Sequence, residues 1–172
     1  REHFDFNMDQ FRFMSDWNHM AILEMTYLPQ QSFKPEDLAK SLGITETQAK
    51  EALVLLQRLE LLESTASGSY QKTKKQFKFQ SSTANLALRK FYHQMLGKAQ
   101  ERLHTQTPQK KMIGTETLPL NVEDLPAAKD IIEFCFQQML ELSKRSQNRT
   151  HVYHLGIQFF QLNSRGNKEV EK

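Results

Sequence analysis

The sequence predicts a mainly helical α+β protein, with a winged helix-turn-helix domain over residues 1–80 and a helix–strand–helix–strand domain over residues 81–172. Three observations predict this class. Apolar residues recur every three or four positions over several long segments, two short helical segments flank a single glycine, and two segments near the C-terminus alternate between apolar and polar residues. The 172 residues are enough for one or two such domains.

The first predicted element is a long helix over residues 8–28. Its apolar stripe repeats at spacings of three and four and consists of Phe11, Met14, Trp17, Ala21, Met25 and Leu28. Pro29 ends the helix, because the residue before a proline is pushed out of the α region. Such a methionine-rich and aromatic stripe is more typical of packing than of a ligand site.

A helix-turn-helix follows. Pro35 suits the first position of a helix, and Gly43 suits the tight stop after it. The second helix begins at Thr45, which forms a capping box with Gln48. The predicted buried face of this helix consists of Ala49, Ala52, Leu53, Leu56 and Leu59.

A β-hairpin is predicted directly after the second helix. Leu61 and Leu62 enter it, the turn lies within residues 64–69, and residues 70–73 return. The turn is long and polar rather than a two-residue type. A helix-turn-helix followed by a hairpin predicts a winged helix.

The second predicted domain begins with a helix over residues 84–104, with its N-cap among residues 81–83. A linker over residues 105–109 then leads to a strand over residues 112–120. The apolar stripe of the helix consists of Leu88, Tyr92, Met95, Ala99 and Leu103.

The domain continues with a helix that Pro126 opens and that ends near Ser146, and with a strand over residues 152–162. Strand, helix and strand would form a right-handed crossover if the two strands pair. Two strands make a poor sheet alone, so a further partner strand is needed. The predicted inner face of the helix consists of Ile131, Cys135, Met139 and Leu142.

Positive charge is concentrated in one part of the chain. The net charge is only +3, but residues 64–111 carry ten basic side chains against Glu101 alone, a local excess of +9. A block of this kind is either a solvated face or a surface for an anionic partner, and double-stranded DNA is the partner that a winged helix favours. The candidate DNA-binding residues are Thr47, Gln48, Lys50, Lys72, Lys74, Lys75, Lys78, Arg89 and Lys90.

The predicted recognition helix is itself poor in positive charge. Glu46 and Glu51 share its exposed surface with the candidate residues, and residues 31–63 sum to −2. Carboxylates near phosphates weaken binding. Two interpretations therefore remain open: the wing holds phosphates while the helix reads few bases, or the winged helix docks a protein in a non-catalytic interaction or sensory module.

An enzyme is not predicted. Cys135 is the only cysteine and lies on an apolar helix face, where an inert core thiol is expected, and the six histidines have no metal-ligand spacing. The chain has no phosphate-binding glycine loop and no nucleophile elbow. We therefore expect no catalytic residue, metal or cofactor.

We also expect no membrane segment and a cytoplasmic location, because no apolar run approaches the ~20 residues needed to span a bilayer. A small-molecule effector site on the strand–helix–strand unit is a weaker third interpretation, with no effector identified.

Several stretches give the chain a resemblance to a family. They include residues 17–24, 38–42, 52–62 and 91–99, and the more specific ones are Thr115-Glu116-Thr117-Leu118 and residues 152–162. On these residues the chain resembles the C-terminal two-thirds of largely uncharacterised bacterial proteins that carry a domain of unknown function and are commonly classed as transcriptional regulators.

The apolar stripes over residues 8–28 and 84–104 and the predicted two-stranded sheet without neighbours favour a homodimer, whose interface would cover them. The resemblance implies a DNA-binding transcription regulator. It also implies a further N-terminal helix-turn-helix segment before Arg1. The chain departs from the family pattern in having Lys110-Lys111 where members have an arginine, and Gln161 where members have a proline. A specific arginine contact would therefore be lost here.

Overall fold

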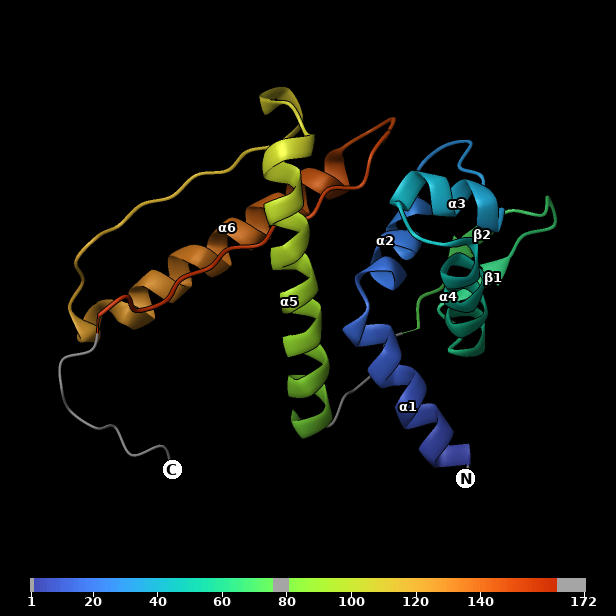
Figure 1. The fold of residues 1–172 in the computed structure, drawn as a ribbon, viewed down its shortest axis with the longest axis horizontal. Helices are drawn as coiled ribbons and strands as arrows, with labels where there is room; N and C mark the ends of the chain where they lie inside the picture. The colour runs from blue at the N-terminus through green and yellow to red at the C-terminus, as the bar shows by residue number, and fades with distance from the viewer. Residues whose placement is uncertain (1, 76–80, 164–172) are drawn as a thin grey trace. The chain divides into compact units, whose positions relative to one another are not determined.

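A computed structural model describes residues 2–75 and 81–163 (Figure 1). Over these residues the fold is mainly helical with a two-stranded antiparallel sheet, consistent with the predicted α+β class. The elements in chain order are α1 (Glu2–Ser15), α2 (Trp17–Met25), α3 (Pro35–Leu42), α4 (Glu46–Arg58), β1 (Leu62–Ser64), β2 (Tyr70–Lys72), α5 (Ser81–Thr105), the short 3-10 helices η1 (Pro108–Lys110) and η2 (Val122–Asp124), and α6 (Leu125–Arg145).

The predicted single helix over residues 8–28 is wrong, because the segment forms two helices. Asp16 separates α1 from α2 in an extended conformation, with φ −108° and ψ 120°. Aspartate favours such positions at helix N-termini over helix interiors. Helix α2 ends at Met25, and the chain then turns before Pro29.

The predicted helix-turn-helix geometry is present in α3 and α4. Pro35 begins α3, and Gly43 ends it with φ 68°, a left-handed conformation that glycine adopts without strain. The capping box forms as expected: the Gln48 amide N–H donates to Thr45 Oγ1 at 3.1 Å, and the Thr45 amide N–H donates to Gln48 Oε1 at 2.9 Å.

The predicted hairpin is also present. β1 and β2 pair antiparallel, with Leu62 opposite Lys72 and Ser64 opposite Tyr70. Gly68 has φ 77° in the turn, and the Thr73 amide donates to the Leu61 carbonyl at 3.0 Å to close the base of the hairpin. The hairpin therefore begins within a few residues of the end of α4.

One hydrophobic core supports these elements. It draws side chains from the C-terminal half of α1, from α2, α3 and α4, and from the entry to β1. Ile22, Leu38, Leu56 and Leu59 are completely buried in it. The predicted inner face of α4 lies in this core or at its edge, because its members are all buried: Ala49, Ala52, Leu53, Leu56 and Leu59.

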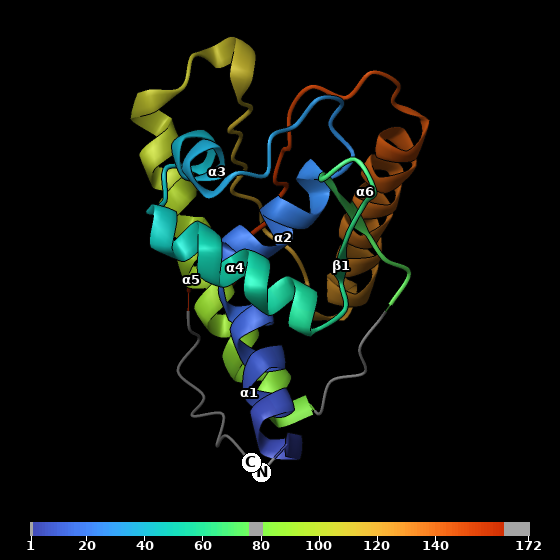
Figure 2. The ribbon, with the colours of Figure 1, turned by 90° about the vertical axis from the view of Figure 1, so that its right-hand side faces the viewer.

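The chain divides into two compact units, which are described separately. The first contains residues 1–117 and 146–152, and the second contains residues 118–145 and 153–172. Within the first unit, α5 packs on α1 and α2 (Figure 2). The structure thus groups α5 with the helix-turn-helix elements and divides the chain elsewhere than at residue 80.

The face by which α5 packs differs from the predicted apolar stripe. Ala87 is buried and Phe91, Gln94 and Lys98 are half-buried along one line of the helix. In the predicted stripe, by contrast, Tyr92, Ala99 and Leu103 are exposed. Two polar side chains therefore take part in the packing, which an apolar pattern does not reveal.

Neither predicted C-terminal strand is present. The structure assigns residues 112–120 and 152–162 to no helix or strand. Within the described ranges, the only sheet is the β1–β2 hairpin, so these segments have no ladder partner. A strand exists only where a neighbour accepts and donates its backbone hydrogen bonds, which explains the difference. The predicted helix–strand–helix–strand domain is therefore wrong in its strands.

The predicted helix after Pro126 is present as α6, but its predicted inner face is not buried. Ile131, Cys135, Met139 and Leu142 are all exposed. The prediction that Cys135 is a core thiol is therefore wrong. The less exposed line of α6 is a different one and contains Leu125, Ala128, Ile132 and Phe136.

Candidate nucleic-acid interface

The outer face of α4 is the surface that a helix-turn-helix would present to a partner. Burial of Ala52 and Leu56 turns the opposite side of the helix outward. That side exposes Thr47 and Lys50, and between the two ends of the helix it also exposes Val54. Glu46 and Glu51 are exposed as well.

Gln48 has a structural role in this helix. Its side-chain oxygen accepts the Thr45 amide hydrogen in the capping box. Reading a base edge with both amide atoms would require that bond to break. Of the three helix residues predicted for DNA, only Thr47 and Lys50 are therefore available in this conformation.

The lysines of the hairpin are partly engaged within the chain. Lys72 Nζ lies 2.7 Å from Glu24 Oε1 and 5.8 Å from the centre of the Tyr27 ring. Lys75 Nζ lies 2.5 Å from Glu60 Oε2. Lys74 is exposed and forms no ion pair with any described residue. Lys78 lies outside the described residues.

The two predicted residues on α5 also differ from each other. Lys90 Nζ lies 2.9 Å from Asp16 Oδ1 and so belongs to the packing of α5 on the α1–α2 break. Arg89 is exposed, and the described part of the chain offers it no carboxylate. The structure thus leaves Lys50, Lys74 and Arg89 as cations for an external anion, whereas Lys72, Lys75 and Lys90 already pair with acidic residues.

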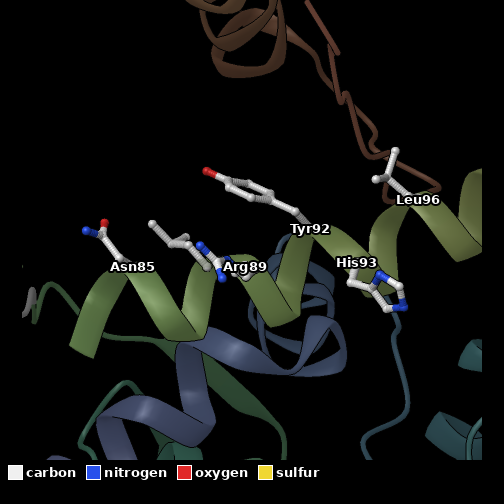
Figure 3. A pocket seen from close by; sticks show the side chains of 6 residues that line it. Asn85, Arg89, Tyr92, His93 and Leu96 are labelled. Carbon is white, nitrogen blue, oxygen red and sulfur yellow. The ribbon is translucent and has the colours of Figure 1, made fainter. Parts of the chain in front are cut away.

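A shallow hollow of about 500 Å³ lies along one face of α5 (Figure 3). Asn85, Tyr92 and Leu96 project from the same side of the helix, and Arg89 and His93 lie beside them. A tyrosine ring next to a guanidinium group can stack with or bind an anionic or aromatic group. The hollow is open to solvent, which favours an extended partner over an enclosed small molecule.

A polar cluster at the α1–α2 break was not predicted. The Trp17 amide donates to Gln94 Oε1 at 3.1 Å, and Gln94 Nε2 donates to Asp16 Oδ1 at 3.0 Å. Lys98 Nζ lies 4.1 Å from the centre of the Trp17 ring. Burial alone would raise the pKa of Asp16, but the hydrogen bond from Gln94 and the Lys90 ammonium outweigh it and lower that pKa below 3.8. The available sequence signal was Asp16, a residue that caps helices, between two apolar repeats.

Two more polar residues lie buried beside this break. Asn18 and His19 have 8% and 5% of their surface exposed. Asn18 Oδ1 and His19 Nδ1 have no hydrogen-bond partner among the described residues. Burial lowers the pKa of His19 below 6.5, because water no longer stabilises the imidazolium, and the nearby Asp16 carboxylate only partly opposes this. Burial therefore favours the neutral form of His19 over the imidazolium.

No group of three or more His, Cys, Asp or Glu side chains is arranged to hold a metal ion in the described ranges. No helix in those ranges is both long and apolar enough to cross a membrane.

Residues 1–162 match a family model described as a domain of unknown function, DUF4423. Comparison with curated proteins gave no match, and comparison with solved structures gave none either. The match spans far more than half of the chain, and it agrees with the sequence resemblance to an uncharacterised family. The chain therefore belongs to the DUF4423 family.

Proposed function

We propose that this chain is a non-catalytic transcription regulator that binds double-stranded DNA through a winged helix formed by α3, α4 and the β1–β2 hairpin, and that acts as a homodimer. This role would place it in the cytoplasm. The observation that carries the proposal is the combination of a Gly43 turn, a capped second helix and a hairpin that begins directly after it. In winged helices the second helix enters the major groove.

The charge distribution supports different roles for different residues of this surface: some suit contacts with bases and others suit contacts with phosphates. Thr47 and Lys50 lie on the outer face of α4, where side chains can reach base edges. Lys74, which follows β2, and Arg89 on α5 are exposed cations suited to phosphates. Lys72 and Lys75 position the hairpin through Glu24 and Glu60 rather than adding free charge.

The first experiment measures affinity for duplex DNA as a function of salt. In the full chain, changing Lys74 and Arg89 together to Gln should flatten the slope of log K against log salt by about 1.8, since each phosphate contact contributes about 0.9. The matched control changes Lys110 and Lys129 to Gln, because both are exposed, carry the same charge and belong to neither α4, the hairpin nor α5. This control should leave the slope unchanged.

A second measurement tests base reading. Thr47→Ala should change the sequence preference obtained by selection from a random duplex library, with a smaller effect on overall affinity. If the wild-type chain shows no salt-dependent affinity for duplex DNA even at low ionic strength, the DNA-binding proposal is overturned.

The alternative function is a protein-docking module, and one observation favours it. Val54 is 56% exposed on the outer face of α4, with Glu51 also exposed on the preceding turn. An exposed aliphatic side chain beside carboxylates suits a protein surface better than a phosphate backbone. Absent DNA binding together with loss of a partner on Val54→Ser would support this alternative.

A further inference from the structure

Helix α6 is apolar on more sides than the described residues of its own compact unit cover. One line of the helix, which contains Ala128, Ile132 and Phe136, is half-buried. A second line is not covered: Ile131 is 71% exposed and Leu142 is 54% exposed. A helix with apolar residues on several faces is normally buried on several faces. The second line therefore needs an occupant.

The spacing of the uncovered line is that of a two-helix seam. Ile131, Cys135, Gln138 and Leu142 follow one another at intervals of four, three and four residues. This is the repeat by which one helix packs along another in a coiled coil. Gln138 is the one polar member, and a single polar residue in a seam fixes its register.

The charges around α6 indicate what the other helix is. Residues 123–133 carry Glu123, Asp124, Asp130 and Glu133 against Lys129, a sum of −3. Residues 136–145 carry Lys144 and Arg145 against Glu141, a sum of +1. Glu123 and Asp124 lie in η2 directly before α6, so α6 together with this lead-in is acidic at its N-terminal end and basic at its C-terminal end. A second copy of the same helix running in the opposite direction brings unlike ends together, whereas a parallel copy brings like ends together.

Helix α5 lacks this self-complementarity. Its charged side chains are Arg89, Lys90, Lys98 and Arg102 against Glu101, a sum of +3. Two copies of α5 would therefore repel each other whatever their direction. This contrast singles out α6 as the helix suited to a self-pairing contact.

We propose that α6 pairs antiparallel with α6 of a second copy, about a two-fold axis that passes between Cys135 and Gln138. In this register Ile131 packs against the partner's Leu142, and Cys135 lies next to the partner's Gln138. The apolar contact supplies the affinity, because ion pairs at a surface contribute little, and the charged ends select the direction. The inference rests on the dimerising part of the proposed function and not on DNA binding.

The first test is the oligomeric state of the full chain by sedimentation velocity at about ten micromolar, a concentration at which a standard interface of ~800 Å² per partner is normally occupied. The wild type should be a dimer, and Ile131→Glu should be a monomer with unchanged helical circular dichroism. The matched control is Leu140→Glu, because Leu140 is 62% exposed but lies off the seam. This control should remain a dimer. A monomeric wild type, or equal behaviour of the two variants, overturns the proposal.

The second test uses disulfide cross-linking and does not depend on a destabilising variant. In a Cys135→Ser background, Ile131→Cys and Leu142→Cys are purified separately, mixed, allowed to exchange and mildly oxidised. Antiparallel pairing predicts a covalent dimer in the mixture and none in either protein alone. Covalent dimers in each protein alone would show parallel pairing and overturn the proposal. The absence of any cross-link would overturn it as well.

These tests separate the inference from the proposed function. A dimer that survives Ile131→Glu and forms no cross-link refutes the α6 interface but leaves a dimeric regulator intact. A chain that passes both tests and does not bind duplex DNA refutes the regulator and leaves the interface intact.

Discussion

Arg58, the last residue of α4, donates two parallel hydrogen bonds to the carboxylate of Asp9 in α1: Nε lies 2.6 Å from Oδ2, and Nη2 lies 2.5 Å from Oδ1. This fork fixes the C-terminal end of α4 against a helix 49 residues earlier in the chain. In the structure the Arg58 guanidinium group is committed to Asp9.

Removing this fork should destabilise the protein. The Asp9 side chain is 11% exposed, so Arg58→Gln leaves a largely buried carboxylate with a weaker partner. Because the Arg58 side chain is 55% exposed, solvent offsets part of the loss, and we expect a decrease of about 1–2 kcal/mol in the free energy of unfolding. Urea denaturation measures it. Arg89→Gln, which removes an exposed arginine with no ion pair in the described residues, should change stability by less than about 0.5 kcal/mol.

Thr45 in the capping box should matter for the stability of the protein, whereas Thr47, two residues later, is proposed to contact DNA. Thr45→Ala removes the acceptor for the Gln48 amide and should lower the free energy of unfolding by about 1 kcal/mol. Thr47→Ala, two residues further along the same helix, removes a hydroxyl that is exposed and should leave stability nearly unchanged. Thermal unfolding compares the two. Equal losses would show that the box is not what holds the start of α4.

The polar cluster at the α1–α2 break should be sensitive to Gln94. Gln94→Leu removes the hydrogen-bond acceptor of the Trp17 amide and one hydrogen-bond donor to the Asp16 carboxylate. Asp16 keeps its ion pair with Lys90. We expect a loss of about 1–2 kcal/mol, the range for unsatisfied polar groups that are partly buried. Gln100→Leu is the control, because Gln100 is exposed on the same helix. A loss of the same size in both variants would mean that helix propensity, and not the cluster, is responsible.

Stability should fall as the solution becomes mildly acidic. Burial lowers the pKa of His19 below 6.5, so the unfolded chain takes up a proton below pH 6.5 more readily than the folded chain does. The contribution of neutral His19 is therefore fully present above pH 6.5 and is lost as the pH falls below that value. Its slope cannot exceed about 1.4 kcal/mol per pH unit, the limit for one proton.

Chemical denaturation between pH 5 and pH 8 tests this dependence. His19→Gln should reduce the slope below pH 6.5, whereas His104→Gln, at an exposed position of α5, should retain it. Asp16, whose pKa is lowered below 3.8, adds a contribution that is present above that pH and is lost in stronger acid. A slope that His19→Gln does not alter would assign the acid sensitivity to other groups.

The elements that the sequence predicted well are those whose signals are local. Gly43, the Thr45–Gln48 box and the hairpin turn each depend on residues within a few positions of one another, and all three are present. The break at Asp16 escaped prediction because the apolar spacing continues across it. The α5 side chains that bind Asp16 in its extended conformation, Gln94 and Lys90, lie far away in the sequence.

The C-terminal elements were harder to predict for a different reason. Apolar alternation over residues 112–120 and 152–162 says which faces would be buried in a sheet, but not whether a neighbour exists. The same holds for α6, where the predicted line through Ile131 is apolar yet exposed. The local excess of positive charge around the candidate DNA-binding residues follows from composition alone. The ion pairs of Lys72, Lys75 and Lys90 with earlier acidic residues could not be read from composition.

The closure of the α1–α2 break by Gln94 has a consequence for the order of folding. Its two hydrogen bonds join residues 77 and 78 positions apart, whereas the contacts between α3 and α4 and within the hairpin are short-range. Contacts of low sequence separation form faster, because closing a long loop costs more chain entropy. On a ribosome, α3, α4 and the hairpin can therefore assemble while α5 is still being synthesised, and the junction between α1 and α2 is completed only after Gln94 has emerged.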